Sequence, residues 1–282
     1  MNTVLTLFAD DLSFRLPEIQ SLLNDLPEKH FSDEHTIRIF VPEDFRLPEN
    51  MAAALYQAKI DYAILPDMAF SDLGLIVSDM DSTLITIECV DEIAARLGIK
   101  NQVAAITERA MRGEIDFRQS LTERVGLLAG LPESELQIVY DEVLKLTSGA
   151  EELLTACHQH GVKFMLVSGG FTFFTDRLKK RLGLDYTYAN VLGTENGKLT
   201  GKVTSEIIDA QRKIELLHQY QNDLNLQTHQ VLAVGDGAND IPMIQAAGIG
   251  VAFHAKPKTQ QAAKVAINFN GLNGILRMFR TL

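Results

Sequence analysis

Short apolar runs alternate with amphipathic stretches along most of this 282-residue chain. Runs rich in Val, Ile, Leu and Phe predict buried strands, whereas apolar residues spaced three and four positions apart predict helices. Before residue 70 the pattern predicts three strands and two helices in alternation. The strands are Val4–Phe8, Thr36–Val41 and Tyr62–Leu65, and the helices are Leu16–Leu26 and Met51–Lys59.

Between Glu88 and Leu146 the pattern becomes wholly helical. Four helices are predicted there, at Val90–Leu97, Gln102–Met111, Asp116–Leu128 and Glu133–Leu146. This block interrupts the strand pattern immediately after a strand that ends in acidic residues. An insertion at such a position is well placed to cover, as a lid, a site on the carboxyl edge of a sheet.

Beyond the insertion the alternation of strands and helices resumes. The predicted strands are Lys163–Val167, Gln230–Val234 and Gly250–Phe253, and the predicted helices are Glu151–His158, Phe171–Leu182, Ala210–Tyr220 and Ile241–Ala247. Asn196 and Gly197 predict a turn between two short extended pieces. Strands separated by helices predict a parallel sheet with helices on both faces.

Three predicted strands end in residues that carry chemistry. Leu75–Val77 is followed by Asp79 and Asp81, Met165–Val167 by Ser168, Gly169 and Gly170, and Val231–Val234 by Asp236, Asn239 and Asp240. Because parallel strands present their carboxyl ends at one edge, these groups are expected to share a site. Like charges at ~4 Å repel by about 4 kcal/mol at an effective dielectric of 20. A cluster of aspartates therefore favours a hard divalent cation, and oxygen ligands suit Mg²⁺.

Two basic residues stand at positions where a lone cation is unfavourable. Arg124 lies on the apolar stripe of its predicted helix, together with Phe117 and Leu121, so it either extends its charge to solvent or binds an acid. Lys213 lies in the first turn of a predicted helix, where the dipole disfavours a positive charge. An anion near Lys213 would compensate for this, although a solvated surface lysine is the alternative.

Composition limits the classes of function. The chain is long enough for one large and one smaller domain, and it contains no stretch apolar enough to span a membrane. The net charge of −11 argues against nucleic-acid binding, which needs a basic surface. The N-terminus lacks a secretory pattern, and Cys89 and Cys157 form no disulfide framework, so a cytoplasmic protein is expected.

The motifs resemble those of the haloacid dehalogenase superfamily of phosphotransferases, and within it the enzymes that hydrolyse phosphoserine. The resemblance covers roughly residues 72–282. It rests on four ordered motifs and on the insertion: Asp79-Met-Asp81-Ser-Thr83, Ser168-Gly-Gly170, Lys213 and Gly235-Asp236-Gly-Ala-Asn239-Asp240, with Glu88 and the run from Met111 to Val125.

This resemblance implies a fold and a domain organisation. The fold is α/β, with a Rossmannoid parallel sheet, a helical cap inserted after its first strand, and a small N-terminal α/β domain similar to ACT domains. The expected catalytic core comprises residues 71–87 and 147–282, and the expected cap residues 88–146. Residues 1–70 form the N-terminal domain, which could bind a regulatory ligand or only support a homodimer.

The resemblance also implies roles for individual residues. Asp79 is the nucleophile that forms an aspartyl phosphate, and Asp81 is the general acid and base. Mg²⁺ is held by Asp79, the backbone carbonyl of Asp81 and Asp236, with Asp240 in support. Ser168, Gly169 and Lys213 are expected to bind phosphate, and Glu88, Arg124, Phe117, Gly170 and Asn239 the rest of the substrate. Glu88 faces its ammonium group and Arg124 its carboxylate.

Structural interpretations of the same residues remain open at this point. Asp81 could be a turn or helix-capping residue, and Ser168 could belong to a simple turn. Asp240 precedes Ile241 and Pro242, a sequence typical of a helix N-cap with proline in the first turn. Its capping and metal-supporting roles are compatible with each other.

The implied activity is Mg²⁺-dependent hydrolysis of O-phospho-L-serine to L-serine and phosphate, the last step of serine biosynthesis. The expected partner is this small molecule alone, without nucleic acid or membrane. One alternative is a phosphatase of the same superfamily that acts on another small phosphomonoester, such as phosphoethanolamine or phosphohomoserine. A more distant alternative is a non-catalytic amino-acid sensor, which would need neither Asp79 nor Asp81.

Overall fold

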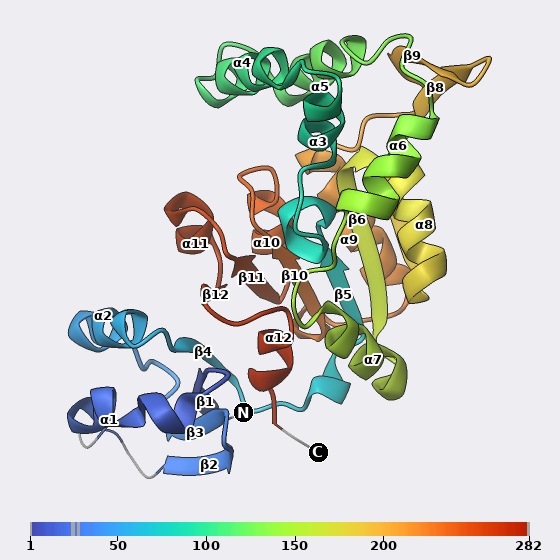
Figure 1. Ribbon diagram of the computed structural model, residues 1–282. Coiled ribbons are helices and arrows are strands. Elements are labelled where there is room, and N and C mark those ends of the chain that lie inside the picture. Colours follow the sequence, from blue (N-terminus) through green and yellow to red (C-terminus); the bar gives the residue numbers. More distant parts are fainter. Residues whose placement is uncertain (1, 24–25, 27–28, 281–282) are drawn as a thin grey trace. The chain divides into compact units, whose positions relative to one another are not determined.

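The computed structural model describes residues 2–23, 26 and 29–280 (Figure 1). Its packing divides the chain into two compact units, and each unit is built from separated segments. The first unit contains residues 1–76, 148–163 and 221–282, and the second contains residues 77–147 and 164–220. The sequence predicts three domains with boundaries near residues 70, 88 and 146. These two units do not test that division, which stays a prediction.

The sheet of the first unit is mixed rather than parallel. Its strands follow the order β2-β3-β1-β4-β12-β11-β10. They are β1 (Thr3–Phe8), β2 (Lys29–Asp33), β3 (Thr36–Val41), β4 (Asp61–Pro66), β10 (Val231–Gly235), β11 (Ile249–Phe253) and β12 (Val265–Ile267). Strands β10, β11 and β12 are parallel, but β4 joins β12 in the antiparallel sense, and the pairs β1/β3, β1/β4 and β2/β3 are antiparallel.

The prediction of a parallel sheet is confirmed for β10, β11 and β12 but does not hold for the N-terminal strands, and the junction between these two groups of strands explains why. Ala266 in β12 pairs with Tyr62 in β4, so the N-terminal strands extend the sheet of the larger fold. Strand β12 has only three residues, which is too few for a periodic signal in the sequence. Strand β2 was not predicted either, because its sequence Lys-His-Phe-Ser-Asp contains a single apolar residue.

The N-terminal strands and helices enclose a common hydrophobic core. Helices α1 (Leu12–Leu23) and α2 (Glu49–Gln57) contribute Leu12, Ile19, Met51 and Leu55, which pack with Leu5, Leu7, Ile37 and Ile39 of the strands. The observed bounds of β3 are those predicted. Helix α1 begins four residues before the predicted start at Leu16. The predicted helix also includes residues 24 and 25, which lie outside the described residues.

Four further helices complete the first unit, namely α7 (Ala150–His160), α10 (Ile241–Ala246), α11 (Pro257–Ala262) and α12 (Gly274–Arg277). Strand β5 (Leu75–Ser78) begins in this unit and ends in the other. Just before β5, the Gly74 amide donates to the Gln230 carbonyl (2.9 Å), and the Lys163 amide donates to the Gly74 carbonyl (3.0 Å). Within the described ranges, no helix is both long and apolar enough to cross a membrane.

The second unit combines the end of the sheet with the helical insertion. Strand β6 (Lys163–Phe171) pairs in parallel with β7 (Tyr186–Asn190), and helices α8 (Thr172–Leu182) and α9 (Ala210–Asp223) follow these strands. The insertion consists of α3 (Cys89–Arg96), α4 (Lys100–Met111), α5 (Phe117–Gly126) and α6 (Ser134–Ile138). We call these four helices the cap. Helix α6 continues directly into a π-helical segment, Val139–Val143, so the helical stretch ends three residues before the predicted end of Glu133–Leu146.

A later hairpin packs beside the cap, as Figure 1 shows for β8 (Leu192–Glu195) and β9 (Lys198–Val203) next to α5. Asn196 and Gly197 form its two-residue turn with φ values of 51° and 73°, as the sequence predicts. Backbone bonds join Gly130 to Leu199 (2.8 Å) and Leu199 to Leu131 (2.8 Å). The helical insertion is therefore extended by residues that follow it by some sixty positions in the sequence, an arrangement no local pattern reveals.

One buried carboxylate links β4 to the loop after β12. Asp61 is 2% exposed and accepts hydrogen bonds from the backbone amides of Asn268 (2.8 Å), Phe269 (3.0 Å) and Asn270 (2.9 Å). The Asn270 side chain adds a fourth bond of 2.7 Å. This carboxylate satisfies backbone and side-chain donors that would otherwise be left without an acceptor.

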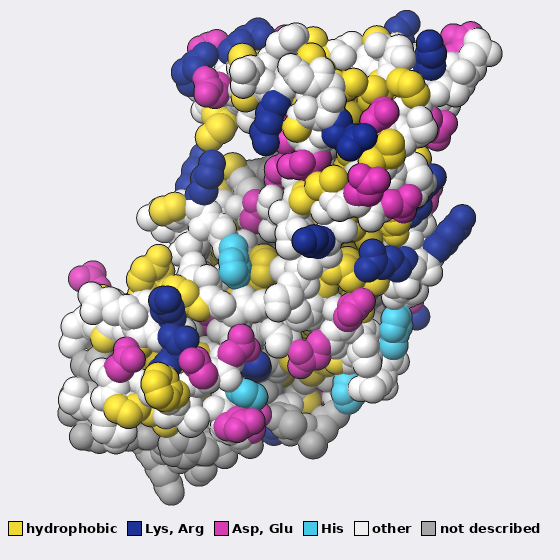
Figure 2. Space-filling view, in the orientation of Figure 1, with side chains coloured by type: hydrophobic (Ala, Val, Ile, Leu, Met, Phe, Trp, Pro, Cys, Tyr) yellow, Lys and Arg dark blue, Asp and Glu magenta, His cyan; other side chains and the backbone are white. Residues whose placement is uncertain are grey.

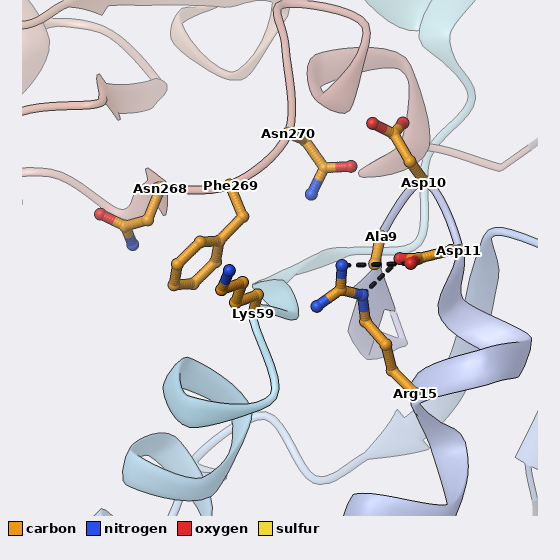
Figure 3. A pocket seen from close by; sticks show the side chains of 8 residues that line it. All are labelled: Ala9, Asp10, Asp11, Arg15, Lys59, Asn268, Phe269 and Asn270. Atoms are coloured by element: carbon orange, nitrogen blue, oxygen red, sulfur yellow. Dashed lines mark hydrogen bonds and ion pairs between the residues drawn. The ribbon is translucent and has the colours of Figure 1, made fainter.

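A cavity of about 420 Å³ lies beside this loop (Figure 3). Within its lining Arg15 bonds to Asp11, and Asp10 lies 2.8 Å from Arg277, which is not a lining residue. Lys59, which is exposed, completes the basic side, and Phe269 forms an apolar wall. The internal ion pairs make the cavity a polar seam between the N-terminal elements and the loop after β12.

Replacement of Asp61 by Ala is expected to destabilise the protein by about 3–5 kcal/mol, because three backbone amides, one of them fully buried and two partly buried, lose their acceptor. Denaturant unfolding followed by circular dichroism measures this change. Asp10→Ala removes an exposed carboxylate of the same seam and should cost less than about 1 kcal/mol. Equal stabilities for the two variants would show that the Asp61 bonds contribute little.

Candidate active site

The loop after β5 carries two of the aspartates that the sequence singled out. Asp79 directly follows the strand in an extended conformation and is buried, with 6% of its surface exposed. The chain then makes one irregular turn over Met80–Leu84, in which Ser82 has a left-handed φ of 54°. The turn places Asp79 and Asp81 together at the carboxyl end of a buried strand.

A buried lysine contacts the first of these aspartates. The Lys213 Nζ atom, on a side chain 1% exposed, donates a 2.8 Å hydrogen bond to Asp79 Oδ1. Lys213 lies in the first turn of α9, where Asp209 accepts a bond from the Arg212 amide (2.9 Å). The anion that the helix dipole argument requires is thus Asp79, and the alternative of a solvated surface lysine is wrong.

The Asp81 carboxyl group lies in an environment that favours its neutral form. Enclosure away from water, followed by the negative charge of Glu88, raises the pKa of Asp81 to about 7. The Cys89 amide, at the start of α3, donates to Asp81 Oδ1 at 3.3 Å and opposes this shift. A carboxyl group with a pKa near neutrality can both donate and accept a proton at physiological pH.

The loop at the end of β6 approaches Asp81 closely. Ser168 is buried, and its Oγ accepts a 2.8 Å hydrogen bond from the Gly170 amide, which leaves the hydroxyl proton available for donation. A Cβ atom at Gly170 would lie 3.2 Å from Asp81 Oδ2 and 3.0 Å from Ser168 Oγ. Only glycine fits here comfortably, so the backbone of this loop lies within reach of the same point as Asp81.

Asn190, at the end of β7, fixes this loop and carries no signal in the sequence. Its Nδ2 donates to the Gly169 carbonyl (2.8 Å), and its Oδ1 accepts from the Ile208 amide (2.9 Å). Asn190 is fully buried, and its bond to the Ile208 amide is also buried. No motif marks this residue, and strand β7 itself was not predicted.

The cap contacts the same loop through its helix α5. A Cβ atom at Gly169 would lie 2.9 Å from Phe117 Cζ, so the Phe117 ring rests directly on this glycine. The next residue, Arg118, makes an ion pair of 2.6 Å with Asp209, which directly precedes α9. These contacts hold α5 over the end of β6 and the start of α9.

Arg124, two helical turns after Phe117, is half-buried on α5. Its Nε donates a 3.4 Å bond to the Ser120 carbonyl. Burial lowers the pKa of Arg124, and the charges of Asp91, Glu88 and Asp81 oppose that shift. An arginine partly removed from water and surrounded by acids is suited to bind an anionic ligand group.

Glu88 stands at the entrance to the cap, as the N-cap residue of α3. Its exposed side chain makes no capping bond to that helix. Instead, Ser82 Oγ donates a 2.7 Å hydrogen bond to Glu88 Oε1. The carboxylate is therefore directed back toward the loop that carries Asp79 and Asp81.

The loop after β10, in the first unit, carries the remaining acidic residues. Asp240 is fully buried; its Oδ2 accepts a bond from the Gly237 amide (3.0 Å), and its Oδ1 lies 3.3 Å from Asn239 Nδ2. Asp240 is the N-cap residue of α10 and Pro242 lies in the first turn, as the sequence predicts, but the Asp240 side chain makes no capping bond to the helix. Asp236 and Asn239 are half-buried on the same loop.

Carboxylates that could hold a metal ion lie in each unit: Asp79 in the second, and Asp236 and Asp240 in the first. The set contains oxygen alone, without histidine or cysteine, which fits a hard cation such as Mg²⁺ better than zinc. It is consistent with the metal site of haloacid dehalogenase-type hydrolases.

Residues 73–248 match the family of haloacid dehalogenase-like hydrolases. A crystal structure of a hydrolase of this family from Salmonella enterica is 33% identical, with a TM-score of 0.87 over 99% of this chain and 98% of that one. These matches define the class of protein to which the fold and the aspartate-bearing loops belong.

Relatives with higher sequence identity indicate which family of haloacid dehalogenase-like hydrolases this is. A phosphoserine phosphatase from Polaromonas is 50% identical over 220 residues, which are 76% of this chain and 93% of that protein. Two solved structures, a phospho-aspartyl intermediate analogue and a substrate-bound complex of phosphoserine phosphatase, are each 39% identical with TM-scores of 0.69. They cover 73% of this chain and 99% and 98% of theirs. The chain belongs to the phosphoserine phosphatase family of haloacid dehalogenase-like hydrolases.

The surface adds one observation about partners. On the face that Figure 2 shows, Lys and Arg side chains are interspersed with Asp and Glu side chains. This distribution differs from the continuous basic surface by which proteins bind nucleic acids.

Proposed function

We propose that this protein hydrolyses O-phospho-L-serine to L-serine and phosphate through an aspartyl-phosphate intermediate. The observation that carries the proposal is the pairing, within one loop, of a lysine-bonded buried carboxylate with a carboxyl group whose pKa is about 7. The first is suited to attack phosphorus and the second to transfer a proton. The substrate-bound and intermediate-analogue structures of the relatives support the assignment.

Asp79 attacks the phosphorus atom in line with the departing seryl oxygen. Lys213 orients the Asp79 carboxylate by the 2.8 Å bond. Asp81, protonated in the first step, donates its proton to the seryl oxygen as the P–O bond breaks. In the second step the Asp81 carboxylate takes a proton from water, which attacks the acyl phosphate and releases phosphate.

Ser168 and the backbone of Gly169 are proposed to donate hydrogen bonds to the phosphoryl oxygens. The Ser168 hydroxyl proton is available because its oxygen accepts from the Gly170 amide. Asp79, the Asp81 carbonyl and Asp236 would hold Mg²⁺, with Asp240 in support, and the ion would neutralise charge on the phosphoryl group. Asn239 lies on the loop that carries Asp236 and is proposed to face the substrate.

The cap supplies recognition of the amino acid. Arg124 is proposed to bind the substrate carboxylate and Glu88 its ammonium group, because the two side chains carry the complementary charges. Phe117, which rests on Gly169, packs against the ligand, and Gly170 lets the substrate approach the end of β6. A zwitterionic phosphomonoester satisfies both charged residues.

We also propose where the protein acts and how it assembles. Cys89 and Cys157 are both buried thiols, in keeping with a reducing cytoplasm. The N-terminal α/β region, for which ACT-type identity stays a prediction, is proposed to regulate the enzyme or to form a homodimer. Sedimentation of the full-length chain tests the second role.

Phosphate release from a panel of phosphomonoesters tests the proposed activity. The protein should hydrolyse phosphoserine with a kcat/KM at least about tenfold above that for phosphoethanolamine, which lacks the carboxylate. Chelation with EDTA should abolish turnover, and added Mg²⁺ should restore it. A preference for phosphoethanolamine or phosphohomoserine would favour another phosphatase of the superfamily, and absence of turnover with Mg²⁺ would favour a sensor.

Replacement of Arg124 by Ala should lower kcat/KM for phosphoserine by about 10²-fold, since a charged hydrogen-bonded pair is lost. The loss for p-nitrophenyl phosphate should stay within about threefold, because that substrate has no carboxylate. Parallel steady-state assays measure both values. Arg109→Ala, which removes an ion pair internal to the cap, is the matched control. Equal losses on the two substrates would contradict carboxylate recognition by Arg124.

A further inference from the structure

The connection between the catalytic loop and the cap contains a hydroxyl group that the mechanism does not use. Ser82 lies three residues after the proposed nucleophile, and Glu88 is the residue from which α3 begins. Ser82 Oγ donates to Glu88 Oε1 at 2.7 Å, and the Ser82 amide donates to the Ile87 carbonyl at 3.2 Å. Both bonds span the segment through which the chain enters the cap.

In that segment two stretches of backbone pair with each other. The Thr86 amide donates to the Lys145 carbonyl (3.0 Å), and the Thr147 amide donates to the Leu84 carbonyl (3.0 Å). Residues 84–86 lead into the cap here, and residues 145–147 lead out of it. The Ser82–Glu88 bond joins two residues that flank the entering stretch, so it connects the residue that precedes α3 to the catalytic loop.

Ser82 makes this bond from an unusual backbone conformation. Its φ of 54° lies in the left-handed region, which is unfavourable for a residue with a Cβ atom. An exposed glutamate that is not held would also sample several rotamers, and ordering it on binding would weaken the complex. A hydroxyl group that holds Glu88 in one rotamer before the substrate binds removes this entropic cost of binding.

We propose that Ser82 is a positioning residue for substrate specificity: it directs the Glu88 carboxylate toward the ammonium group of the substrate. The loop after β5 then positions both the attacking oxygen of Asp79 and the Glu88 carboxylate that recognises the amino group. The inference rests on the proposed function, because it assigns Glu88 to the ammonium of phosphoserine. Ser82 itself touches no reacting atom.

Two substrates that differ only in the amino group test this role. They are O-phosphoserine and 3-(phosphonooxy)propanoate, which keeps the carboxylate and the phosphoryl group but lacks the ammonium. In Ser82→Ala the ratio of their kcat/KM values should fall about fivefold to twentyfold, through a higher KM for phosphoserine. Ser82→Gly relieves the left-handed backbone and also lacks the hydroxyl, so it should show the same fall.

Two further variants separate positioning from a general structural effect. Ser82→Asn tolerates the left-handed conformation and carries an amide donor, so it should restore most of the ratio. In a Glu88→Gln background, Ser82→Ala should lower the ratio by less than about twofold, because the two residues act through one interaction. Thr86→Ala, which removes an exposed hydroxyl of the same segment, is the control and should keep the wild-type ratio.

The outcomes are distinguishable. Independent effects of Ser82→Ala and Glu88→Gln, or equal losses on both substrates, would overturn the role of Ser82 while the proposed function stands. If the wild-type protein did not discriminate between the two substrates, amino-group recognition itself would fail, and the inference about Ser82 would fail with it. Thermal unfolding of each variant shows that the comparison is made on folded protein.

Discussion

Replacement of Asp79 by Asn is expected to lower turnover of phosphoserine by on the order of 10⁴-fold or more, because the attacking carboxylate is replaced by a neutral amide. Asn keeps the size of the side chain and an oxygen that can accept the Lys213 bond. The fold should therefore survive, with a loss of about 1–3 kcal/mol of stability from the charge left on Lys213. Phosphate release and circular dichroism measure the two effects.

The same experiment can detect the covalent intermediate directly. Wild-type protein mixed with phosphoserine and quenched in acid should carry one phosphoryl group that hydroxylamine removes, and Asp79→Asn should carry none. Asp223→Asn, which changes an exposed carboxylate at the end of α9 by the same charge, is the control and should retain activity. An Asp79→Asn variant that is folded and fully active would rule out attack by this carboxylate.

Replacement of Asp81 by Asn should lower kcat for phosphoserine by about 10²- to 10⁴-fold, the usual contribution of general acid–base catalysis. The alkoxide of serine is a poor leaving group and needs a proton as it departs. p-Nitrophenolate leaves without one, so the variant should release about one equivalent of nitrophenol per enzyme and then stop as aspartyl phosphate. Stopped-flow absorbance at the nitrophenolate band measures this burst.

The pH dependence of the wild-type protein follows from the same group. Asp81 has a pKa of about 7, raised from 3.8, so it is mostly protonated below pH 7 and mostly ionised above it. If donation of its proton limits the rate, kcat for phosphoserine should fall as pH rises through about 7. This descending limb should be absent in Asp81→Asn. Asp116→Asn, which keeps a capping oxygen at the start of α5, should retain the limb.

The local pattern of the sequence predicted most elements within a few residues. Strand β3 has its predicted bounds, and α4, α8 and β11 start or end close to the predicted residues, because periodic apolar positions report burial on one face. The elements that were not predicted are short or polar, and their stability comes from neighbours. Strand β7 forms because it pairs with β6, and β12 because it lies between β11 and β4.

The topology of the sheet was predicted incompletely for a related reason. Alternating strands and helices favour parallel pairing within the larger fold, and β10, β11 and β12 follow that rule. Nothing in the first seventy residues indicates that β4 adds to the edge of the same sheet. That addition depends on Asp61 and the amides of residues 268–270, which are some two hundred positions away.

The residues of the candidate site also differ in whether the sequence could indicate them. The residues with chemically reactive side chains stand in dense motifs at strand ends, and the sequence by itself indicated Asp79, Asp81, Ser168 and Asp236. Residues that only hold them in place, such as Asn190 and Ser82, carry no such signal. Their roles depend on which loops meet, and a serine or asparagine occurs in many loops.

The sequence alone determined that this chain contains an α/β phosphotransferase-like fold with a helical insertion and an acidic, oxygen-donating site, because strand periodicity and strand-end motifs are local properties. Tertiary structure decided what those groups do to one another. It buried Lys213 against Asp79, raised the pKa of Asp81 by enclosure and by Glu88, and directed the Asp240 side chain away from a capping role. Burial and close approach arise from contacts between distant segments, and only the folded chain creates them.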